Sequence, residues 1–292
     1  MCRARISMIN LCRTYMMEAD NKIEICKKSS AHFVQAAQSP YYQILLFQGK
    51  GTFLVDFTEY SFSGNTVLFL TPYQHFQWID AAQIDIEVLK FHGDFYCIEY
   101  HKKEVACNGL LFNNIYLVPH ITIKSDNYHD ILSFFAKIEH EKESGNEFSN
   151  AILKAYLQLI LALCSKEKNT FLNDKQLEDT EMHEVVQFQS MLEQHFIKER
   201  SPTFYASKFC LSTGAFGKKI KKHFGKNPSQ LIQDRVILEA KKLLHLTHKS
   251  IKEIAAELNF EDEFYFSRYF KKNVGLSPLH YREYVGISIV AK

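Results

Sequence analysis

The stretch SIKEIAAELNFEDEFYFSRYFKKNVGLSPLHYREY, residues 250–284, decides the fold of the C-terminal part of this chain. Ile251, Ile254 and Leu258 recur at helical spacing, so they give a first short helix one apolar face. Asn259 follows it, and asparagine is one of the few non-glycine residues that accept the left-handed conformation of a tight turn. The pattern therefore predicts a short helix followed by a sharp change of direction.

A second helix is predicted over residues 262–272. Phe266 and Phe270 stand four residues apart and point inward together, and Gly275 and Pro278 end the helix. Its outer face is polar and basic, with the side chains of Asp262, Glu263, Phe264, Ser267, Arg268, Lys271 and Lys272. Such a pair is a helix-turn-helix, whose second helix can enter the major groove of DNA. An ordinary helical hairpin with a solvated face gives the same local pattern, so one copy alone does not decide between them.

A second copy of the pattern lies upstream and favours DNA binding. Phe216 and Ile220 form its inward pair on a helix predicted over residues 213–223. Its outer positions and its N-cap are Ser212, Thr213, Gly214, Gly217, Lys218, Lys221 and Lys222. As a single helix, residues 228–246 would span roughly 28 Å, close to the ~34 Å between successive major grooves on one face of DNA. Two reading helices on a rigid spacer suit a DNA-binding domain.

Residues 182–284 resemble the DNA-binding domain of the AraC/XylS family of bacterial transcription regulators. The resemblance is carried by LSTGAFGKKIKKHFGKNPSQLIQDRVILEAKKLL in the first unit and by IKEIAAELNFEDEFYFSRYFKKNVGLSPLHYR in the second. It implies a seven-helix domain with recognition helices at 213–223 and 262–272. It further implies a sequence-specific regulator, more often an activator than a repressor, with promoter DNA and RNA polymerase as partners.

The resemblance also identifies Gly214, Gly217 and Lys218 as base-contacting positions of the first recognition helix. Two glycines are a departure there, because each costs roughly 1 kcal/mol of helix stability relative to alanine and removes a side chain that could touch a base. We expect the first unit to contribute less direct readout; the alternative is that the glycines let the backbone approach DNA closely. In the second unit, Arg268 can recognise guanine, Glu263 cytosine, Ser267 either, and Phe264 a thymine methyl group.

The N-terminal part is predicted to be rich in β-strands. Between residues 31 and 120, short apolar runs such as 44–47 and 115–117 are separated by turn residues, among them QGKG at 48–51 and Ser63 to Asn65. In position and pattern this part resembles the cupin-like sensing domain of many members of the same family. The expected fold class is α+β: an N-terminal cupin-like β-barrel with a following helix pair, and a C-terminal all-α domain with two helix-turn-helix units.

The domain boundaries follow from the same patterns. We expect a tail that is disordered over residues 1–30, a sensing and dimerisation domain over 31–166, a polar linker over 167–180 and the DNA-binding domain over 181–286. The helix pair near residues 126–143 and 147–166 either only covers the barrel or, as in the family, also forms a homodimer. Aromatic residues fill the predicted barrel; a few of them could line a pocket for a small-molecule effector, whose identity the sequence does not give.

Composition and charge support this assignment. The 292 residues are 46% hydrophobic and 23% charged, as in a globular protein, and no apolar run is long enough for a membrane helix. Residues 181–292 contain 18 Lys and Arg against 12 Asp and Glu, whereas residues 1–180 contain 17 against 21, so the basic half is the predicted DNA-binding half. The seven scattered cysteines predict free thiols, and with no signal peptide recognised we expect a cytoplasmic protein.

No catalytic, metal or cofactor motif stands out. Cupin enzymes typically use an HxH pair, whereas His75, His92, His101 and His120 each stand alone, so we expect no metal and no cofactor. Two alternatives to an effector-controlled regulator remain. One is a constitutive dimeric regulator that binds no ligand, and the other is a cupin-type enzyme with a DNA-binding appendage.

Overall fold

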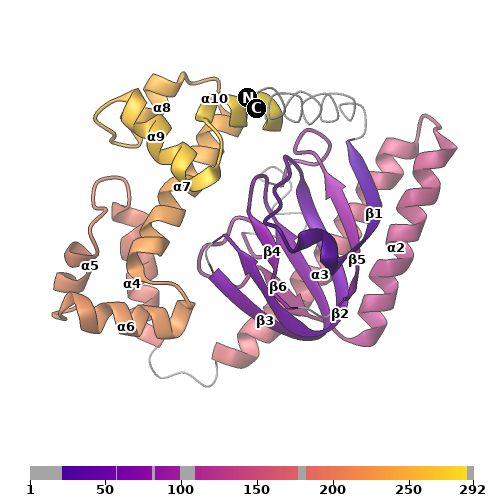
Figure 1. Cartoon of the computed structure of the whole chain (residues 1–292), viewed down its shortest axis with the longest axis horizontal. Helices are drawn as coiled ribbons and strands as arrows, with labels where there is room; N and C mark the ends of the chain where they lie inside the picture. Colours follow the sequence, from indigo (N-terminus) through magenta and orange to yellow (C-terminus); the bar gives the residue numbers. More distant parts are fainter. Residues whose placement is uncertain (1–21, 57, 81–82, 99–108, 177–181, 288–292) are drawn as a thin grey trace, which may run out of the picture.

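A computed structural model describes residues 22–287, except for 57, 81–82, 99–108 and 177–181. The chain forms an N-terminal β-sheet, a pair of long helices and a group of shorter C-terminal helices (Figure 1). The predicted α+β class is therefore confirmed.

Within the described residues, the sheet is antiparallel and has six strands. In spatial order β1, β5, β2, β3 and β6 lie side by side, and β4 pairs with the far half of β2. The described ladders leave β1 and β6 at the edges, so closure into a cupin-like barrel stays a prediction. The strands are β1 Ile23–Ser29, β2 Tyr42–Val55, β3 Thr58–Leu70, β4 Phe76–Trp78, β5 Asp85–Phe91 and β6 His120–Thr122, with a short 3-10 helix, η1, at Ser30–Phe33.

The turn expected at residues 48–51 and the corner expected at 63–65 are wrong. Both segments lie inside the two longest strands, β2 and β3, whose ladder continues through them. Gly49 pairs with Gly64, and their φ angles of 137° and 87° belong to glycine-favouring regions. Two facing glycines therefore let both strands bend together without breaking the ladder.

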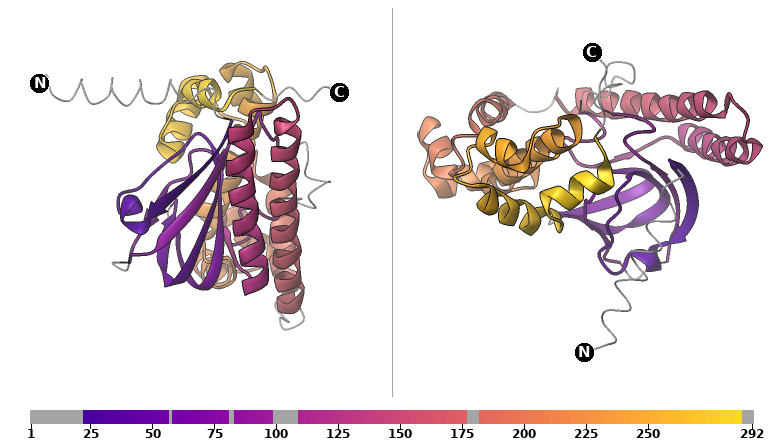
Figure 2. Two further views of the ribbon diagram at one scale, coloured as in Figure 1. Left: turned by 90° about the vertical axis from the view of Figure 1, so that its right-hand side faces the viewer. Right: turned by 90° about the horizontal axis from the view of Figure 1, so that it is seen from above.

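The two faces of the sheet bury different cores. Helices α2 (Ser125–Ser144) and α3 (Ser149–Gln176) run side by side along one face (Figure 2, left). Alternate residues such as Ile44 and Leu46 pack there against the helices, whereas Leu45 and Phe47 point to the other face. That second face is aromatic, and Trp78 is almost fully buried in it, as expected for core residues on alternating strand positions.

The structure differs from the expected domain plan at three places. Residues 23–29 of the supposed tail form β1, which pairs with β5 along its whole length because its apolar residues complete the sheet. Helix α3 continues to Gln176, ten residues into the supposed linker, and buries Lys168. Residues 115–117 are not a strand, and the sheet is completed instead by β6. Residues 1–21 and 177–181 lie outside the described part of the chain.

The described residues of the C-terminal part form the seven helices that the resemblance implies. Their apolar faces share one core, which includes Phe216, Ile220, Phe266 and Phe270. Of the helices in the described ranges, none is long and apolar enough to span a membrane. The seven are α4 Met182–His195, α5 Pro202–Lys208, α6 Thr213–Phe224, α7 Pro228–Leu246, α8 Ile251–Glu257, α9 Glu263–Val274 and α10 Pro278–Val285.

Candidate nucleic-acid interface and the interdomain cavity

Helix α6 begins and ends with defined caps. The Ser212 hydroxyl accepts a hydrogen bond from the backbone N–H of Ala215 at 3.2 Å, which satisfies one free donor of the first turn. At the other end Gly225 is left-handed, with φ of 70°, and its N–H donates to the carbonyl of Lys221. Both ends of the helix are therefore capped by residues of the chain itself.

Helix α9 repeats this construction. The Asp262 carboxylate accepts a hydrogen bond from the N–H of Tyr265 at 2.6 Å, and Gly275 ends the helix with φ of 88°. Because Ser212 and Asp262 both cap helices in this way, the structure gives these two predicted DNA-binding residues a local structural role.

The turn before each recognition helix is also repeated. Asn259 has φ of 55°, as predicted, and Cys210 has the same φ at the corresponding turn of the first unit. In both turns a backbone N–H returns to the preceding helix, from Leu211 to Ala206 and from Phe260 to Ala255. The role of Cys210 was not predicted, because cysteine carries no preference for the left-handed region.

Burial along the two recognition helices is matched position by position. From Gly214 to Lys222 and from Phe264 to Lys272, the order of exposed, half-buried and buried residues is identical. The first, fourth and fifth positions of this pattern, Gly214, Gly217 and Lys218, therefore correspond to Phe264, Ser267 and Arg268. Of the fourteen predicted residues none is buried, and only Gly217, Glu263 and Ser267 are partly covered.

The two exposed faces differ chemically. On α9 the outward side chain of Phe264 is 68% exposed, a large exposure for an aromatic ring, and it lies one turn before Arg268. On α6 the matching positions hold Gly214 and Lys218, so only a cation projects. Lys219, the neighbouring lysine on α6, forms an ion pair with Glu184 of α4.

The glycines of α6 are not required by packing. A Cβ atom added to Gly214 or to Gly217 would meet no other heavy atom within 4 Å, apart from the helix's own neighbouring backbone. Neither residue has a positive φ angle. Their small size is therefore not needed for the fold of the free protein.

Helix α7 joins the two units as the predicted single helix. It begins with a capping box, in which Asn227 and Gln230 satisfy each other's backbone N–H groups, and Pro228 occupies the first turn. Its 19 residues correspond to a length of roughly 28 Å.

The β-sheet domain holds both helix-turn-helix units. The Gln38 amide donates to the carbonyl of Val274, at the end of α9, with an N···O distance of 3.0 Å, and also to the carbonyl of Tyr73. On the side of the first unit, the Tyr116 hydroxyl donates to Glu193 of α4 at 2.9 Å, and the Tyr116 ring contacts that of Phe224 at the end of α6. These contacts connect the C-terminal helices to segments that join the strands of the sheet domain.

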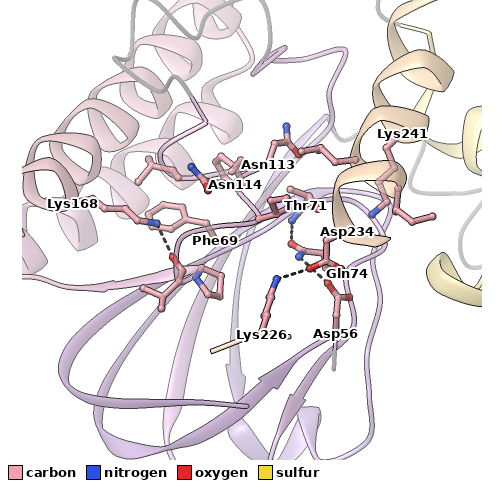
Figure 3. Close-up of a pocket in the computed structure, with 17 residues that line it drawn as sticks. Asp56, Phe69, Thr71, Gln74, Asn113, Asn114, Lys168, Lys226, Asp234 and Lys241 are labelled. Atoms are coloured by element: carbon pink, nitrogen blue, oxygen red, sulfur yellow. Dashed lines mark hydrogen bonds and ion pairs between the residues drawn. The ribbon is translucent and has the colours of Figure 1, made fainter. Parts of the chain in front are cut away.

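A cavity of about 100 Å³ lies where the sheet, α3 and α7 meet (Figure 3). Its wall includes three lysines, Lys168 from α3, Lys226 from the turn before α7 and Lys241 from α7, together with Asp56 and Asp234. Lys226 pairs with Asp234 at 2.7 Å, and burial lowers the pKa of Lys241 to about 8, with Asp56 and Asp234 opposing the shift. Sequence reasoning missed this cluster.

The described residues contain no group of three or more His, Cys, Asp and Glu side chains that could hold a metal ion. His75 contacts the amide of Gln38, and His92 contacts the carbonyl of Tyr284. Burial, with a smaller contribution from Lys168, lowers the pKa of His120 to about 4, so this ring is neutral near pH 7. His101 lies outside the described residues.

Comparison with known proteins finds a family model in the C-terminal part and relatives among transcription regulators. Residues 205–284 match a family model described as "Helix-turn-helix domain". The HTH-type transcriptional activator RhaS of Escherichia fergusonii is 21% identical over 246 residues, which cover 82% of this chain and 84% of that protein. RhaS of Salmonella schwarzengrund is 30% identical over 97 residues, 33% of this chain and 35% of that protein. Among solved structures, ToxT from Vibrio cholerae is 14% identical, with a TM-score of 0.38 over 90% of this chain and 99% of that chain.

Proposed function

We propose that this chain, an AraC/XylS-type transcription regulator with a double helix-turn-helix domain, binds promoter DNA by placing α6 and α9 in successive major grooves. The observation that carries the proposal is the matched exposure of the two helices at the ends of α7. A spacer of roughly 28 Å suits adjacent grooves that face the same side of the duplex.

The two helices have unequal tasks in this proposal. Arg268 and Phe264 project from α9, and a guanidinium group can donate two hydrogen bonds to guanine, whereas an aromatic ring contacts a thymine methyl group. On α6, Lys218, Lys221 and Lys222 serve Coulombic contacts, chiefly to phosphates, which position the domain but carry little sequence information. We therefore assign most of the base readout to α9.

Activation of transcription is the direction we propose. The two relatives described above, RhaS of Escherichia fergusonii and RhaS of Salmonella schwarzengrund, are both named as transcriptional activators. Activation requires contact with RNA polymerase, and control by a small-molecule effector would act through the sheet domain that holds both units.

A homodimer completes the proposed arrangement. Helix α3 leaves Leu159 42% exposed on the side away from its buried row of Leu153, Leu157 and Leu161. This face is where we place the dimer contact. Size measurement in solution with Leu159→Glu tests it, and an unchanged dimer would refute this placement.

The proposal is tested by capturing DNA bound by the tagged protein across the genome, for the wild type and for Arg268→Ala. We expect sharp promoter peaks that the substitution removes. Lys124→Ala, an exposed cation at the start of α2, is the matched control and should keep the peaks. Diffuse binding that Arg268→Ala leaves unchanged would overturn sequence reading by α9.

A further inference from the structure

We propose that Cys97 is a peroxide-reactive thiol, activated by the buried imidazole of His245 at the junction between the sheet domain and the second helix-turn-helix unit. The proposal goes beyond the proposed function, because it gives the chain a site of covalent modification. The reactant is a small hydroperoxide, of which hydrogen peroxide is the simplest member.

Three segments of the chain meet at this site. Cys97 follows β5, His245 lies in the last turn of α7, and Gly286 caps the end of α10. The side chain of His245 is 6% exposed, whereas Cys97 is partly exposed and forms no disulfide. The imidazole is therefore held inside the protein, and the cysteine can still be reached from solvent.

Hydrogen bonds fix the orientation of the His245 ring. Its Nδ1 atom lies 2.9 Å from the carbonyl oxygen of Gly286, and because a carbonyl only accepts, Nδ1 carries a hydrogen. The other ring nitrogen, Nε2, is left for the hydrogen bond that His245 also forms with the side chain of Cys97. Gly93 makes room for this edge of the ring, since a Cβ atom added there would lie 3.0 Å from Nε2 and from Cε1.

The surroundings of the pair favour a thiolate beside an imidazolium. Burial by itself lowers the pKa of His245, but the hydrogen bonds with Cys97 and with the Gly286 carbonyl, together with the charge of Asp94, outweigh burial and raise this pKa. A cysteine next to a protonated histidine is a thiolate at lower pH than an isolated one, and the thiolate is the nucleophile.

Cys26 in β1 provides an internal comparison. It is also partly exposed and also forms no disulfide. Burial raises the pKa of its thiol, with smaller opposing contributions from Lys90 and Lys28. Two thiols of similar exposure therefore differ in their surroundings, and we expect Cys97 to be the more reactive of the two.

The reaction is a two-electron oxidation of the sulfur. The thiolate of Cys97 attacks one oxygen of hydrogen peroxide, so that an S–O bond forms and the O–O bond breaks. The departing hydroxide takes the proton from Nε2 of His245 and leaves as water. The products are a sulfenic acid on Cys97 and a neutral imidazole, and the ion pair between the two side chains is lost.

Loss of this pair should loosen the second unit, a step that rests on the proposed function. The chain of contacts from Cys97 through His245 to Gly286 joins the segment after β5 to α7 and to the end of α10. Helix α10 in turn packs on α9, where the rings of Tyr281 and Phe270 lie 5.5 Å apart between centroids. Oxidation of Cys97 should therefore reduce the affinity for operator DNA.

The first test measures the reactivity of each cysteine in the full chain, without DNA. The protein is labelled with iodoacetamide across a range of pH, and the modified peptides are quantified by mass spectrometry. At pH 7 Cys97 should react at least about tenfold faster than Cys26, with a midpoint of its pH profile below about 7.5. In His245→Gln this midpoint should move toward about 8.5, the ordinary value for cysteine, whereas His248→Gln, which replaces an exposed histidine just beyond α7, should leave it unchanged.

The second test uses hydrogen peroxide. Dimedone should trap the sulfenic acid at Cys97 in preference to Cys26, and the oxidised wild type should bind operator DNA at least threefold more weakly than the reduced protein. Cys97→Ser keeps a hydroxyl group that can hydrogen-bond to His245 but cannot be oxidised in this way, so its operator affinity should not respond to peroxide.

Several results would overturn the proposal. These are a Cys97 that reacts no faster than Cys26 in the wild type, a midpoint that is the same in His245→Gln, or an equal loss of operator affinity in oxidised wild type and oxidised Cys97→Ser. The comparison within the wild type needs no substitution, so it holds even if His245→Gln folds poorly. Because the labelling needs no DNA, a protein that binds no operator in either redox state would count against the proposed function and not against this site.

Discussion

The glycines of α6 give the sharpest prediction, because stability and DNA binding should respond differently to one double substitution. In Gly214→Ala with Gly217→Ala, each new methyl group enters open space, and neither residue has a positive φ angle. Replacing glycine by alanine inside a helix stabilises it by up to about 1 kcal/mol per residue. Gly214 lies in the first turn, where the gain is smaller, so we expect about 1–2 kcal/mol for the pair.

Urea unfolding of the full chain measures this gain. With a typical m value, the midpoint should rise by about 0.5–1 M. Gly225→Ala is the matched control on the same helix: its added methyl group also meets nothing within 4 Å, but φ of 70° disfavours alanine, so this variant should lose about 1–2 kcal/mol. A double variant no more stable than the wild type would refute the reasoning about helix propensity.

Titration of the double variant with operator DNA separates the two accounts of these glycines. If Gly214 and Gly217 simply make no base contacts, the affinity of the double variant for operator DNA should stay within about twofold of the wild type, a change of about 0.4 kcal/mol. A tenfold or larger loss on both operator and random DNA would instead show that the backbone of α6 approaches the duplex closely. That result would refute the account that we favour.

Four further predictions follow from the described contacts. Arg268→Ala should weaken operator binding by about 1–3 kcal/mol and random DNA much less, as measured by titration; equal losses on both would exclude base readout. Lys221→Ala should weaken binding to all sequences alike and reduce the slope of log K against log salt by about 1, whereas an unchanged slope would exclude a phosphate contact. Lys241 has a pKa of about 8 in the folded chain and a higher one when unfolded, so the unfolded state binds more protons between these values. The free energy of unfolding should therefore rise as pH increases from about 8 to 10, and this rise should be absent in Lys241→Met. The pKa of His120 is about 4 in the folded chain and about 6.5 in the unfolded chain, so the unfolded state binds more protons between these values. The free energy of unfolding should therefore fall by up to roughly 3 kcal/mol as pH falls from 6.5 to 4, and His120→Phe should unfold at lower pH than the wild type.

Local patterns predicted the recognition units well. The inward pairs of α6 and α9 are buried, the helices end at left-handed glycines, and Asn259 adopts the expected turn conformation. These features depend on residues within one or two helical turns, so the sequence contains the whole signal. The matching turn at Cys210 was missed because its residue type has no such preference.

Features that depend on distant segments were not predicted. From the sequence alone, Gly49 predicts a turn. The structure shows that it lies inside a strand and pairs with Gly64 across the ladder, so both strands bend together there. Lys168, Lys226 and Lys241 are separated by up to 73 positions and meet only because α3 and α7 border the same sheet. Lys168 also lay in the supposed polar linker, where a lysine is normally solvated, and tertiary packing buried it.

The matched but chemically unequal recognition helices have a consequence for promoter architecture. Because α6 and α9 belong to one chain and expose different side chains, a single protomer should recognise an asymmetric DNA sequence, with one end read by α6 and the other by α9. The stretch under α9 would tolerate few base changes and the stretch under α6 many. Such an asymmetric site fixes the direction in which the protein faces along the duplex, so inverting it relative to the start of transcription should change the output of the promoter even where occupancy is equal.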